Sequence, residues 1–293
     1  MQRFGKPRLL IIGCGDVGLR LLALLREKYK VFALTSSLDR FDTLRKSGAI
    51  PIYGDLDQAS SLWRLSQLAP YVIHLAPPPQ QGSKDTRTRN LLRILSQQSG
   101  FIRQLTYIST TGVYGDCKGA VIDETYSTQA RTARALRRVS AEAQIRAWGV
   151  AQGVKTTILR VPGIYAQTRL PIDRLKKGMP ALSPQDDVFT NHIHADDLAR
   201  LISYAIYRAP TQRIFNACDS SELKMGDYFD LVAEAFNLPK APRVARSELE
   251  KRLDPMMLSF MSESRRIQNH RLDELRFRLQ YPTVESFLSS QTK

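Results

Sequence analysis

The sequence predicts an α/β fold: a Rossmann-like, doubly wound parallel sheet with a small, mostly helical C-terminal lobe. Three observations support this prediction. An apolar run at 9–12 feeds a Gly-x-Gly-x-x-Gly turn at 13–18, and leucines at helical spacing follow it. Short apolar runs then alternate with helical patterns as far as residue 160. Beyond residue 218 the pattern is mainly helical, with prolines as breaks.

The first turn has the composition of a dinucleotide fingerprint. Gly13 permits a tight turn, Gly15 lets backbone approach a pyrophosphate, and Gly18 lets the helix pack close to the strand. Asp16 and Val17 begin the helix, whose unpaired N–H groups favour phosphate. We therefore expect all five residues to bind the cofactor. The alternative is a glycine-rich turn without a ligand.

The remaining elements follow in order along the chain. Strands are predicted at 30–34, 49–53, 71–75, 105–108, 156–160 and 213–218. Helices are predicted at 39–47, 60–68, 85–98, 130–148, 196–207 and 225–236, with a long loop over 109–128. The strands are near-continuous apolar runs, which is typical of a parallel sheet covered on both faces. Ligands of such sheets bind at the carboxyl ends of the strands.

Length and composition indicate two parts in a chain of ordinary globular character. Its 293 residues are 43% hydrophobic and 24% charged. We expect an NAD(P)-binding domain over 1–218, which includes part of the substrate lobe near 166–189, and a C-terminal substrate lobe over 219–293. No apolar run reaches membrane-spanning length, so no membrane partner is expected. Three widely spaced cysteines without a C-x-x-C pair indicate a cytoplasmic protein without disulfides or a metal site.

The formal net charge of +15 raises the question of an anionic partner. The arginines cluster without interleaved aromatic residues, and no nucleic-acid-binding motif is present. Nucleic acid is therefore not the expected partner. We expect a small-molecule substrate instead, either anionic or nucleotide-linked. Nothing in the pattern predicts the oligomeric state.

The end of the second strand normally selects the cofactor. Thr35 and Ser36 stand there without an acidic residue, and Arg40 follows closely. A hydroxyl-rich, basic tip favours a ribose phosphate over free ribose hydroxyls. We predict NADP as the preferred cofactor and NAD as the alternative. In the competing interpretation, Asp39 caps its helix and Arg40 points to solvent.

Six segments carry a resemblance to a known family. The chain resembles the NAD-dependent epimerase/dehydratase group of the extended or atypical short-chain dehydrogenases/reductases. The segments are 13–18, 54–56, 74–77, 109–115, 159–165 and 191–197. The resemblance implies a Rossmann domain with a substrate lobe, and it adds Asp55, Leu56, Leu75, Ala76 and Pro77 to the expected cofactor contacts. Asp55 either accepts a hydrogen bond from the adenine amino group or caps the next turn.

The resemblance also implies a catalytic Ser or Thr, a Tyr, and a Lys four residues after the Tyr. Thr110 stands at the Ser/Thr position. Glu142 marks the register of the long helix and puts Arg138 at the Lys position and Arg134 at the Tyr position. Arginine does not deprotonate near neutral pH, so it cannot replace the tyrosine as an acid–base group. Arg138 keeps the charge and donors needed to hold the nicotinamide ribose.

Several alternatives remain open at this point. Tyr114 and Lys118 have the right spacing, but the glycines around them do not favour a helix. A surrogate acid would be Tyr114, Tyr126, Tyr165, a bound water, or one of the histidines 192 and 194. Those histidines precede two aspartates, and the resemblance explains the segment as a helix start at Asp196 rather than a metal site.

The arginines of the long helix allow two interpretations as well. Arg131, Arg134 and Arg138 share one helix face, which either binds an anionic substrate or is solvated, and Arg137 is expected to point elsewhere. The predicted function is an NAD(P)-dependent oxidoreductase or sugar-nucleotide epimerase without the usual Tyr/Lys pair. The alternative is a dinucleotide-binding sensor or regulatory protein without catalysis.

Overall fold

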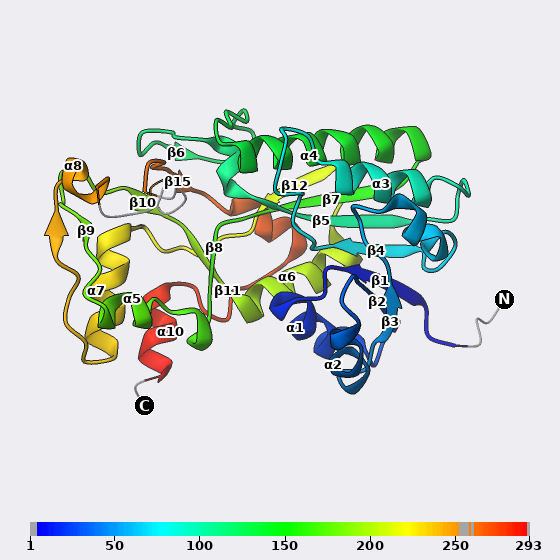
Figure 1. Ribbon diagram of the computed structural model, residues 1–293, viewed down its shortest axis with the longest axis horizontal. Helices are drawn as coiled ribbons and strands as arrows, with labels where there is room; N and C mark the ends of the chain where they lie inside the picture. Colours follow the sequence, from blue (N-terminus) through cyan, green and yellow to red (C-terminus); the bar gives the residue numbers. More distant parts are fainter. Residues whose placement is uncertain (1–4, 252–257, 259–260, 292–293) are drawn as a thin grey trace.

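A seven-stranded parallel sheet forms the centre of the molecule in the computed structural model (Figure 1). The structure describes residues 5–251, 258 and 261–291. From one edge to the other the strands are β12 (Arg213–Asn216), β7 (Lys155–Val161), β5 (Gln104–Thr110), β4 (Tyr71–His74), β1 (Arg8–Ile12), β2 (Lys30–Thr35) and β3 (Ile50–Tyr53). The predicted doubly wound α/β fold is confirmed.

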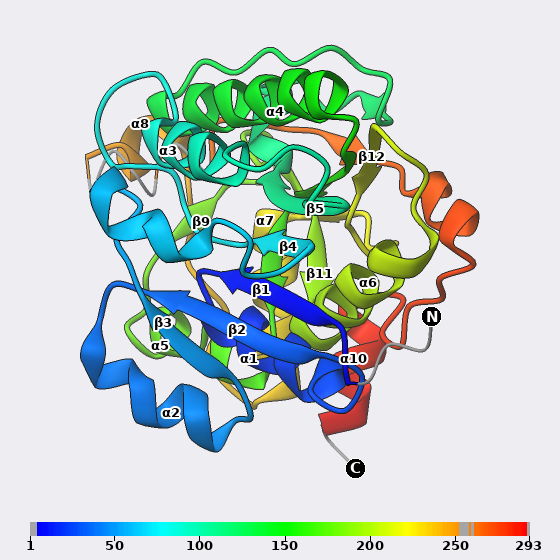
Figure 2. The ribbon, with the colours of Figure 1, turned by 90° about the vertical axis from the view of Figure 1, so that its right-hand side faces the viewer.

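Helices cover both faces of this sheet, as Figure 2 shows. On one face lie α1 (Asp16–Leu25), α2 (Phe41–Lys46) and α6 (Ala195–Arg208), and on the other lie α3 (Thr86–Leu95) and α4 (Ala133–Gln152). The interiors of the strands are buried because both sides are covered, except in the edge strand β3, which is partly exposed. The helix ends follow ordinary capping chemistry: Asp85 accepts a hydrogen bond from Thr88 N at 3.0 Å, and Gly153 ends α4 with a φ of 63°.

The strand order reverses between β1 and β4. The chain leaves β1 towards β2 on one side, whereas β4 lies on the other side, with Ile12 opposite His74. A crevice opens at such a reversal, outside the carboxyl ends of the two strands. The glycine turn after β1 and the segment 75–79 after β4 border it.

A smaller lobe lies beyond the carboxyl edge of the sheet, on the left in Figure 1. A separate apolar core holds it together, formed by residues of 165–182, 223–249 and 281–288 with Leu258 and Met261. Its elements are β8 (Gly163–Tyr165), η4 (Gln167–Arg169), α5 (Ile172–Lys176), β9 (Ala181–Leu182), β10 (Phe189–Thr190), β11 (His192–His194), β13 (Leu223–Lys224), α7 (Met225–Ala235), β14 (Arg243–Val244), α8 (Arg246–Leu249) and α10 (Val284–Gln291). The predicted domain boundary at residue 218, between the NAD(P)-binding domain and the C-terminal substrate lobe, stays a prediction. Within the C-terminal part, Leu272, Leu275 and Phe277 pack into the core of the sheet domain.

The structure corrects several predicted elements. The helix predicted at 60–68 is the 3-10 helix η2 (Ala59–Leu65), in which the Ser61 hydroxyl donates to Gln58 O at 2.7 Å and so competes with regular α-helical pairing. The helix predicted at 39–47 divides into the 3-10 turn η1 (Leu38–Arg40) and α2. The loop over 109–128 contains the 3-10 helix η3 (Thr111–Tyr114) and β6 (Val121–Ile122), and β6 pairs with β15 (Arg266–Ile267). The C-terminal segment also holds the 3-10 helix η5 (His270–Leu275), so it is less regularly helical than predicted.

The long helix begins later than the sequence predicts. Thr132 caps α4 by accepting a hydrogen bond from Ala135 N at 3.3 Å, so Arg131 lies outside the helix. The prediction that Arg131, Arg134 and Arg138 share one helix face is therefore wrong for Arg131.

Candidate functional site

The glycine turn after β1 has the shape that a bound pyrophosphate requires. Gly13 has a φ of +83°, and a Cβ there would lie 2.6 Å from Ala76 N, so no other residue fits. A Cβ on Gly15 would meet nothing within 4 Å among the described residues. Gly15 is also the N-cap of α1 and has no side chain to satisfy the first N–H groups of that helix. The turn leaves both space and hydrogen-bond donors for a phosphate, so the residues present fit a dinucleotide.

Gly18 allows α1 to approach the segment after β4. A Cβ on Gly18 would lie 3.1 Å from Cys14 Sγ and 3.3 Å from Leu75 Cδ1. Leu75 N donates to Ile12 O at 2.8 Å, and this bond holds the segment beside the glycine turn. Ala76 is buried, whereas Pro77 is exposed. The two loops expected to contact a cofactor therefore touch each other.

Arg40 closes over the glycine turn. Its Nη2 donates to Cys14 O at 2.7 Å, so the side chain does not extend into solvent. Neither η1 nor α2 is capped by a side chain, so the competing interpretation of Asp39 as a helix cap is wrong. Thr35 ends β2, and its Oγ1 accepts a hydrogen bond from Ser37 N at 3.2 Å, while Ser36 is exposed. The basic group and the hydroxyls after β2 thus lie near the turn.

Asp55 and Leu56 have local structural partners. Asp55 Oδ1 accepts a hydrogen bond from Asp57 N at 2.9 Å, so this carboxylate caps a turn as one alternative predicted. Leu56 is buried, and its carbonyl oxygen accepts a hydrogen bond from Asn90 Nδ2 at 2.8 Å. Their contact with an adenine stays a prediction.

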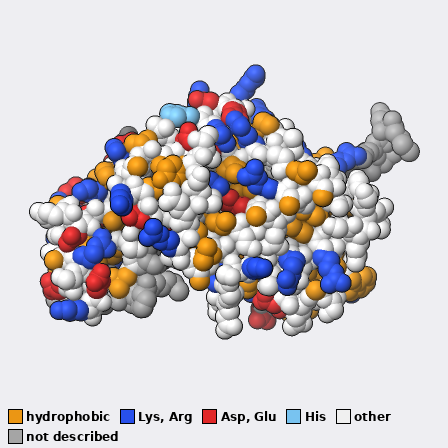
Figure 3. All heavy atoms as spheres, turned by 90° about the horizontal axis from the view of Figure 1, so that it is seen from above, with side chains coloured by type: hydrophobic (Ala, Val, Ile, Leu, Met, Phe, Trp, Pro, Cys, Tyr) orange, Lys and Arg blue, Asp and Glu red, His pale blue; other side chains and the backbone are white. Residues whose placement is uncertain are grey.

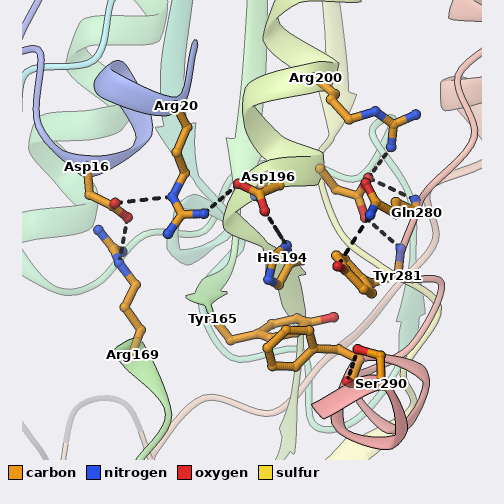
Figure 4. Close-up of polar contacts among 12 residues, drawn as sticks. Asp16, Arg20, Tyr165, Arg169, His194, Asp196, Arg200, Gln280, Tyr281 and Ser290 are labelled. Carbon is orange, nitrogen blue, oxygen red and sulfur yellow. Dashed lines mark hydrogen bonds and ion pairs between the residues drawn. The ribbon is translucent and has the colours of Figure 1, made fainter. Parts of the chain in front are cut away.

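The side chain of Asp16 belongs to a chain of ion pairs between α1, η4 and α6 (Figure 4). Asp16 lies 3.1 Å from Arg20 Nε and 3.0 Å from Arg169 Nε. Arg20 in turn binds Asp196 Oδ1 at 2.5 Å. The carboxylate of Asp16 is therefore engaged in ion pairs and ties the smaller lobe to the first turn of α1, so only the backbone of Asp16 is left for a phosphate.

The two histidines of β11 have neighbours that explain them without a metal. His194 Nδ1 accepts a hydrogen bond from Asp196 N at 3.2 Å and so caps α6 (Figure 4). Its ring lies 4.3 Å from the ring of Tyr281. His192 stacks on Tyr228 with ring centroids 4.3 Å apart. Within the described ranges, no group of three or more His, Cys, Asp or Glu residues could hold a metal ion.

A cavity of about 910 Å³ lies between the carboxyl ends of β5 and β7, the start of α4 and the smaller lobe. Thr110, Arg134 and Arg138 line it on one side, and Tyr165 and His192 line it on the other. Pro77 also borders it, so the cavity continues from the segment after β4. The volume is that of a small-molecule site.

A family model now identifies the chain. The model of the NAD-dependent epimerase/dehydratase family matches residues 9–218. The chain belongs to this family. No curated protein sequence shows significant similarity to it.

Solved structures share the whole fold with this epimerase/dehydratase-family protein. A functionally unknown conserved protein from Silicibacter pomeroyi is 27% identical, with a TM-score of 0.83 over 97% of this chain and 98% of that chain. UDP-glucose 4-epimerase from Thermotoga maritima is 17% identical, with a TM-score of 0.78 over 97% of both chains. MoeE5 in complex with UDP-glucose and NAD is 19% identical, with a TM-score of 0.74 over 98% of this chain and 97% of that chain.

Arg138 is held firmly at the cavity wall. Its Nη1 donates to Tyr107 Oη at 2.8 Å and to Ile108 O at 2.9 Å, beneath the end of β5. Glu142 lies one turn further on and is fully engaged: it pairs with Arg160 Nη2 at 2.8 Å and accepts a hydrogen bond from Ser109 Oγ at 2.5 Å. The acid that set the sequence register is therefore a buried anchor of α4 against β5 and β7.

Arg137 does not point away from the site, and that expectation is wrong. It is buried at 7% exposure, lines the cavity, and donates from Nη1 to Gly82 O at 2.7 Å. The α4 segment supplies Arg134, Arg137 and Arg138 to the cavity together, because side chains three and four residues apart share a helix face.

Of the suggested surrogate acids, Tyr165 and His192 line the cavity. Burial raises the pKa of Tyr165 well above its ordinary value and lowers the pKa of His192 to about 4. Tyr114 is fully buried and donates to Asn216 Oδ1 at 2.7 Å. Tyr114 and Tyr126 are outside the cavity lining, so the structure places neither of them at the site.

Sequence reasoning missed Arg265 and Tyr228, which also line the cavity. The loops of the central sheet contribute lining residues only as far as Pro162, which directly follows β7. Tyr228 and Arg265 both lie more than 60 residues beyond it. No local pattern marks them, because only tertiary packing brings them to the cavity.

Basic side chains elsewhere do not form one continuous band on the face drawn in Figure 3. They are interspersed there with acidic, hydrophobic and uncharged polar groups. No helix of the described residues is long and apolar enough to cross a membrane.

Proposed function

We propose that this protein is an NADP-preferring oxidoreductase or sugar-nucleotide epimerase that works without the usual Tyr/Lys pair. The observation that carries the cofactor preference is Arg40, whose guanidinium lies 2.7 Å from Cys14 O at a β2 end that has no acidic side chain. A guanidinium there recognises a ribose phosphate through charge and paired N–H groups. An acidic side chain at that place would instead select the ribose hydroxyls of NAD.

The proposed cofactor site follows the carboxyl ends of β1, β2 and β4. Backbone N–H groups of Asp16, Val17 and Gly18 face the phosphates, Gly15 leaves room for the pyrophosphate, and Gly13 forms the turn, as the uncapped start of α1 supports. Thr35, Ser36 and Arg40 take the adenosine ribose, Asp55 and Leu56 border the adenine, and Leu75, Ala76 and Pro77 follow the nicotinamide half. When bound, the dinucleotide supplies hydride transfer. Every other role belongs to this chain's own residues.

Arg138 holds the nicotinamide ribose in this proposal, and Arg134 stands where the family's tyrosine is expected. The anchoring of Arg138 by Tyr107 and Ile108 supports the first assignment, since it fixes a charged donor at the cavity wall. Thr110 ends β5 at the same wall and can hydrogen-bond a substrate oxygen. Among the candidate acids predicted from the sequence, Tyr165 and His192 line the cavity, and the proposal assigns the proton transfer to one of them.

A second candidate function is a dinucleotide-binding sensor without turnover. The environment of Tyr165 favours the sensor. Burial raises the pKa of Tyr165 further from neutrality, and such a tyrosine is a poor general acid–base group. The two candidates share the cofactor site and differ only in chemistry.

One set of titrations tests the cofactor assignment. Binding of NADPH and of NADH is followed by fluorescence for the wild type, Arg40→Ala and Arg45→Ala. Arg45 is a matched control because it follows Arg40 by five residues, is exposed, and contacts only its own helix, in a pair with Asp42 and over the ring of Phe41, among the interactions of the described residues. We expect the wild type and Arg45→Ala to bind NADPH more tightly than NADH, and we expect Arg40→Ala to lose this preference. Equal affinity of the wild type for both cofactors would contradict the preference. Reduction of bound NADP⁺ by an offered sugar nucleotide, whose hydroxyl-bearing carbon gives up the hydride and becomes a ketone, separates the enzyme from the sensor.

A further inference from the structure

The side chain of Arg169 reaches the start of α1 from the smaller lobe. Arg169 is the last residue of η4, and its guanidinium extends towards Asp16, the first residue of α1 (Figure 4). Its Nε lies 3.0 Å from Asp16 Oδ2. The proposed function assigns the cofactor pyrophosphate to the backbone N–H groups of this first turn. A positive charge of the smaller lobe therefore lies beside the place assigned to the phosphates.

The ion pair with Asp16 leaves the hydrogen-bond donors of Arg169 unused. Asp16 Oδ2 is buried and has no hydrogen-bond donor among the described residues, so Arg169 contacts it as a charge rather than through a directed hydrogen bond. Asp16 is also the one partner of the Arg169 guanidinium in the described part of the chain. A guanidinium carries several N–H donors in a planar fork, and this side chain is 37% exposed. Its donors are therefore available to a ligand.

Arg20 is the second cation beside Asp16, and its donors are already used. Its Nε donates to Asp16 Oδ1 at 3.1 Å, and its Nη1 donates to Asp196 Oδ1 at 2.5 Å. Asp16 therefore keeps a partner when Arg169 turns to a ligand, so its carboxylate is not left unpaired. Arg169 is the cation of this chain of ion pairs that can change its partner.

The charge of Asp16 gives a reason for a cation at this place. A carboxylate in the first turn of α1 is stabilised by the helix dipole, but it repels a pyrophosphate, which carries negative charge on each phosphate. The neighbouring Gly15 leaves open space, since a Cβ there would meet nothing within 4 Å among the described residues. A guanidinium that contacts both the carboxylate and a phosphate removes this repulsion.

We infer that Arg169 binds the pyrophosphate of the bound dinucleotide and so adds a residue of the smaller lobe to the cofactor site. The inference rests on the proposed function, because it takes the dinucleotide as the ligand, and it deepens that function by extending the cofactor site across both lobes. Guanidinium groups bind phosphate oxygens through paired, charge-assisted hydrogen bonds. The bound cofactor then holds the smaller lobe to the start of α1.

Fluorescence titration of the protein with NADPH and with NADH tests this inference. Arg169→Gln should weaken the binding of both dinucleotides about tenfold or more, and by similar factors, because both carry the pyrophosphate. Arg169→Lys should recover part of the affinity through its retained charge. Lys176→Gln is the control, because Lys176 is an exposed cation of the same lobe, and it should bind both dinucleotides as the wild type does.

Asp16→Asn distinguishes a phosphate contact from a simple tie between the lobes. Asp16→Asn and Arg169→Gln break the same ion pair, so a purely structural role of the pair predicts equal losses of affinity. A phosphate contact predicts that Asp16→Asn binds both dinucleotides at least as tightly as the wild type, because Arg169 remains and a repelling carboxylate is gone. Thermal unfolding checks that each variant folds. Wild-type affinity in Arg169→Gln, a loss confined to NADPH, or equal losses in the two variants would overturn the inference.

Failure of the proposed function gives different results. Equal affinity of the wild type for NADPH and NADH contradicts the NADP preference but leaves this comparison intact, since the comparison needs only the pyrophosphate. A wild type that binds neither dinucleotide refutes the cofactor site and overturns the inference with it. A wild type that binds them, together with an Arg169→Gln variant of the same affinity, overturns the inference alone.

Discussion

The guanidinium of Arg40 and the carbonyl oxygen of Cys14 lie 2.7 Å apart, so the segment after β2 closes over the glycine turn after β1. These residues are separated by 26 positions in the chain and meet because β1 and β2 are parallel neighbours with their carboxyl ends at the same edge. The contact places a permanent positive charge beside the glycine turn, to which the proposed function assigns the cofactor phosphates. It therefore makes the cofactor site testable without knowledge of the substrate.

Gly15→Val should abolish dinucleotide binding and leave the fold intact. A Cβ at Gly15 meets nothing within 4 Å in the described part of the chain, so valine is accommodated in the free protein but occupies the place of the pyrophosphate. Fluorescence titration with NADPH measures the loss, and thermal unfolding reports the fold. Gly13→Ala is the contrasting variant, because its Cβ would collide with Ala76 N and lower stability as well. Unchanged NADPH affinity in Gly15→Val would refute the placement of the cofactor.

Arg138→Ala should weaken NADPH binding by roughly 1.5–3 kcal/mol, since a charge-assisted hydrogen bond to the ribose is lost. Arg146→Ala is the control on the same helix and should change little, because Arg146 is exposed away from the cavity. Arg138→Lys should recover part of the affinity through its retained charge. If Arg138→Ala and Arg146→Ala bind NADPH equally well, Arg138 is not the ribose-holding residue.

Glu142→Gln should lower the free energy of unfolding by about 3–5 kcal/mol, because it leaves the buried Arg160 without its counter-charge. Arg160 and Glu142 are 5% and 6% exposed and lie 2.8 Å apart. Urea unfolding measures the change. Asp42→Asn serves as the comparison, since it breaks an exposed pair with Arg45 and should cost at most about 1 kcal/mol. Similar losses in the two variants would show that the buried pair does not anchor α4.

Acid should destabilise the protein in part through His74. Burial, with a smaller contribution from the charge of Arg138, lowers the pKa of His74 to about 3. The unfolded chain binds a proton at this residue below about pH 6.5, whereas the native protein does not until about pH 3. Stability contributed by neutral His74 is therefore complete above pH 6.5 and falls as the pH drops towards 3.

His74→Gln should reduce the slope of stability against pH between pH 6 and 4 by about 1.4 kcal/mol per pH unit, the equivalent of one proton. Glutamine keeps an N–H that can donate to Thr88 Oγ1, which lies 3.1 Å from His74 Nε2. Urea unfolding at a series of pH values provides the slopes. His270→Gln is the control, because His270 is exposed. Identical slopes in the wild type and His74→Gln would contradict the assignment.

The double variant Arg134→Tyr with Arg138→Lys should gain turnover on sugar nucleotides if a missing proton donor is the only defect. A general acid–base group contributes about 10²–10⁴-fold to rate. Arg134→Phe with Arg138→Lys is the matched control, since it lacks only the hydroxyl. Steady-state rates and bound-cofactor absorbance are the readouts. Brisk wild-type turnover that survives Tyr165→Phe and falls in His192→Gln would instead identify the histidine as the working acid.

The sequence by itself determined the order of strands and helices along the chain and the glycine turn after β1. Both depend on short-range patterns, namely apolar runs and glycines at fixed spacing. Such patterns involve residues close together in the chain, so they can be recognised in the sequence without knowledge of the fold. The ends of helices and strands were harder to predict, because the start of α4 depends on a single hydrogen bond that Thr132 accepts from Ala135 N.

Only the tertiary structure decided which side chains share the cavity. Tyr114 follows β5 and reads as a candidate acid, yet packing buries it against Asn216, 102 residues further on. Arg137 is predicted to point elsewhere on the helix than Arg138, yet it lines the cavity and donates to Gly82 O, 55 residues earlier in the chain. Arg265 comes to the same cavity from near the C-terminus. The physical reason is that burial and hydrogen-bond partners are set by contacts between distant segments, and these contacts have no periodicity that one segment alone can display.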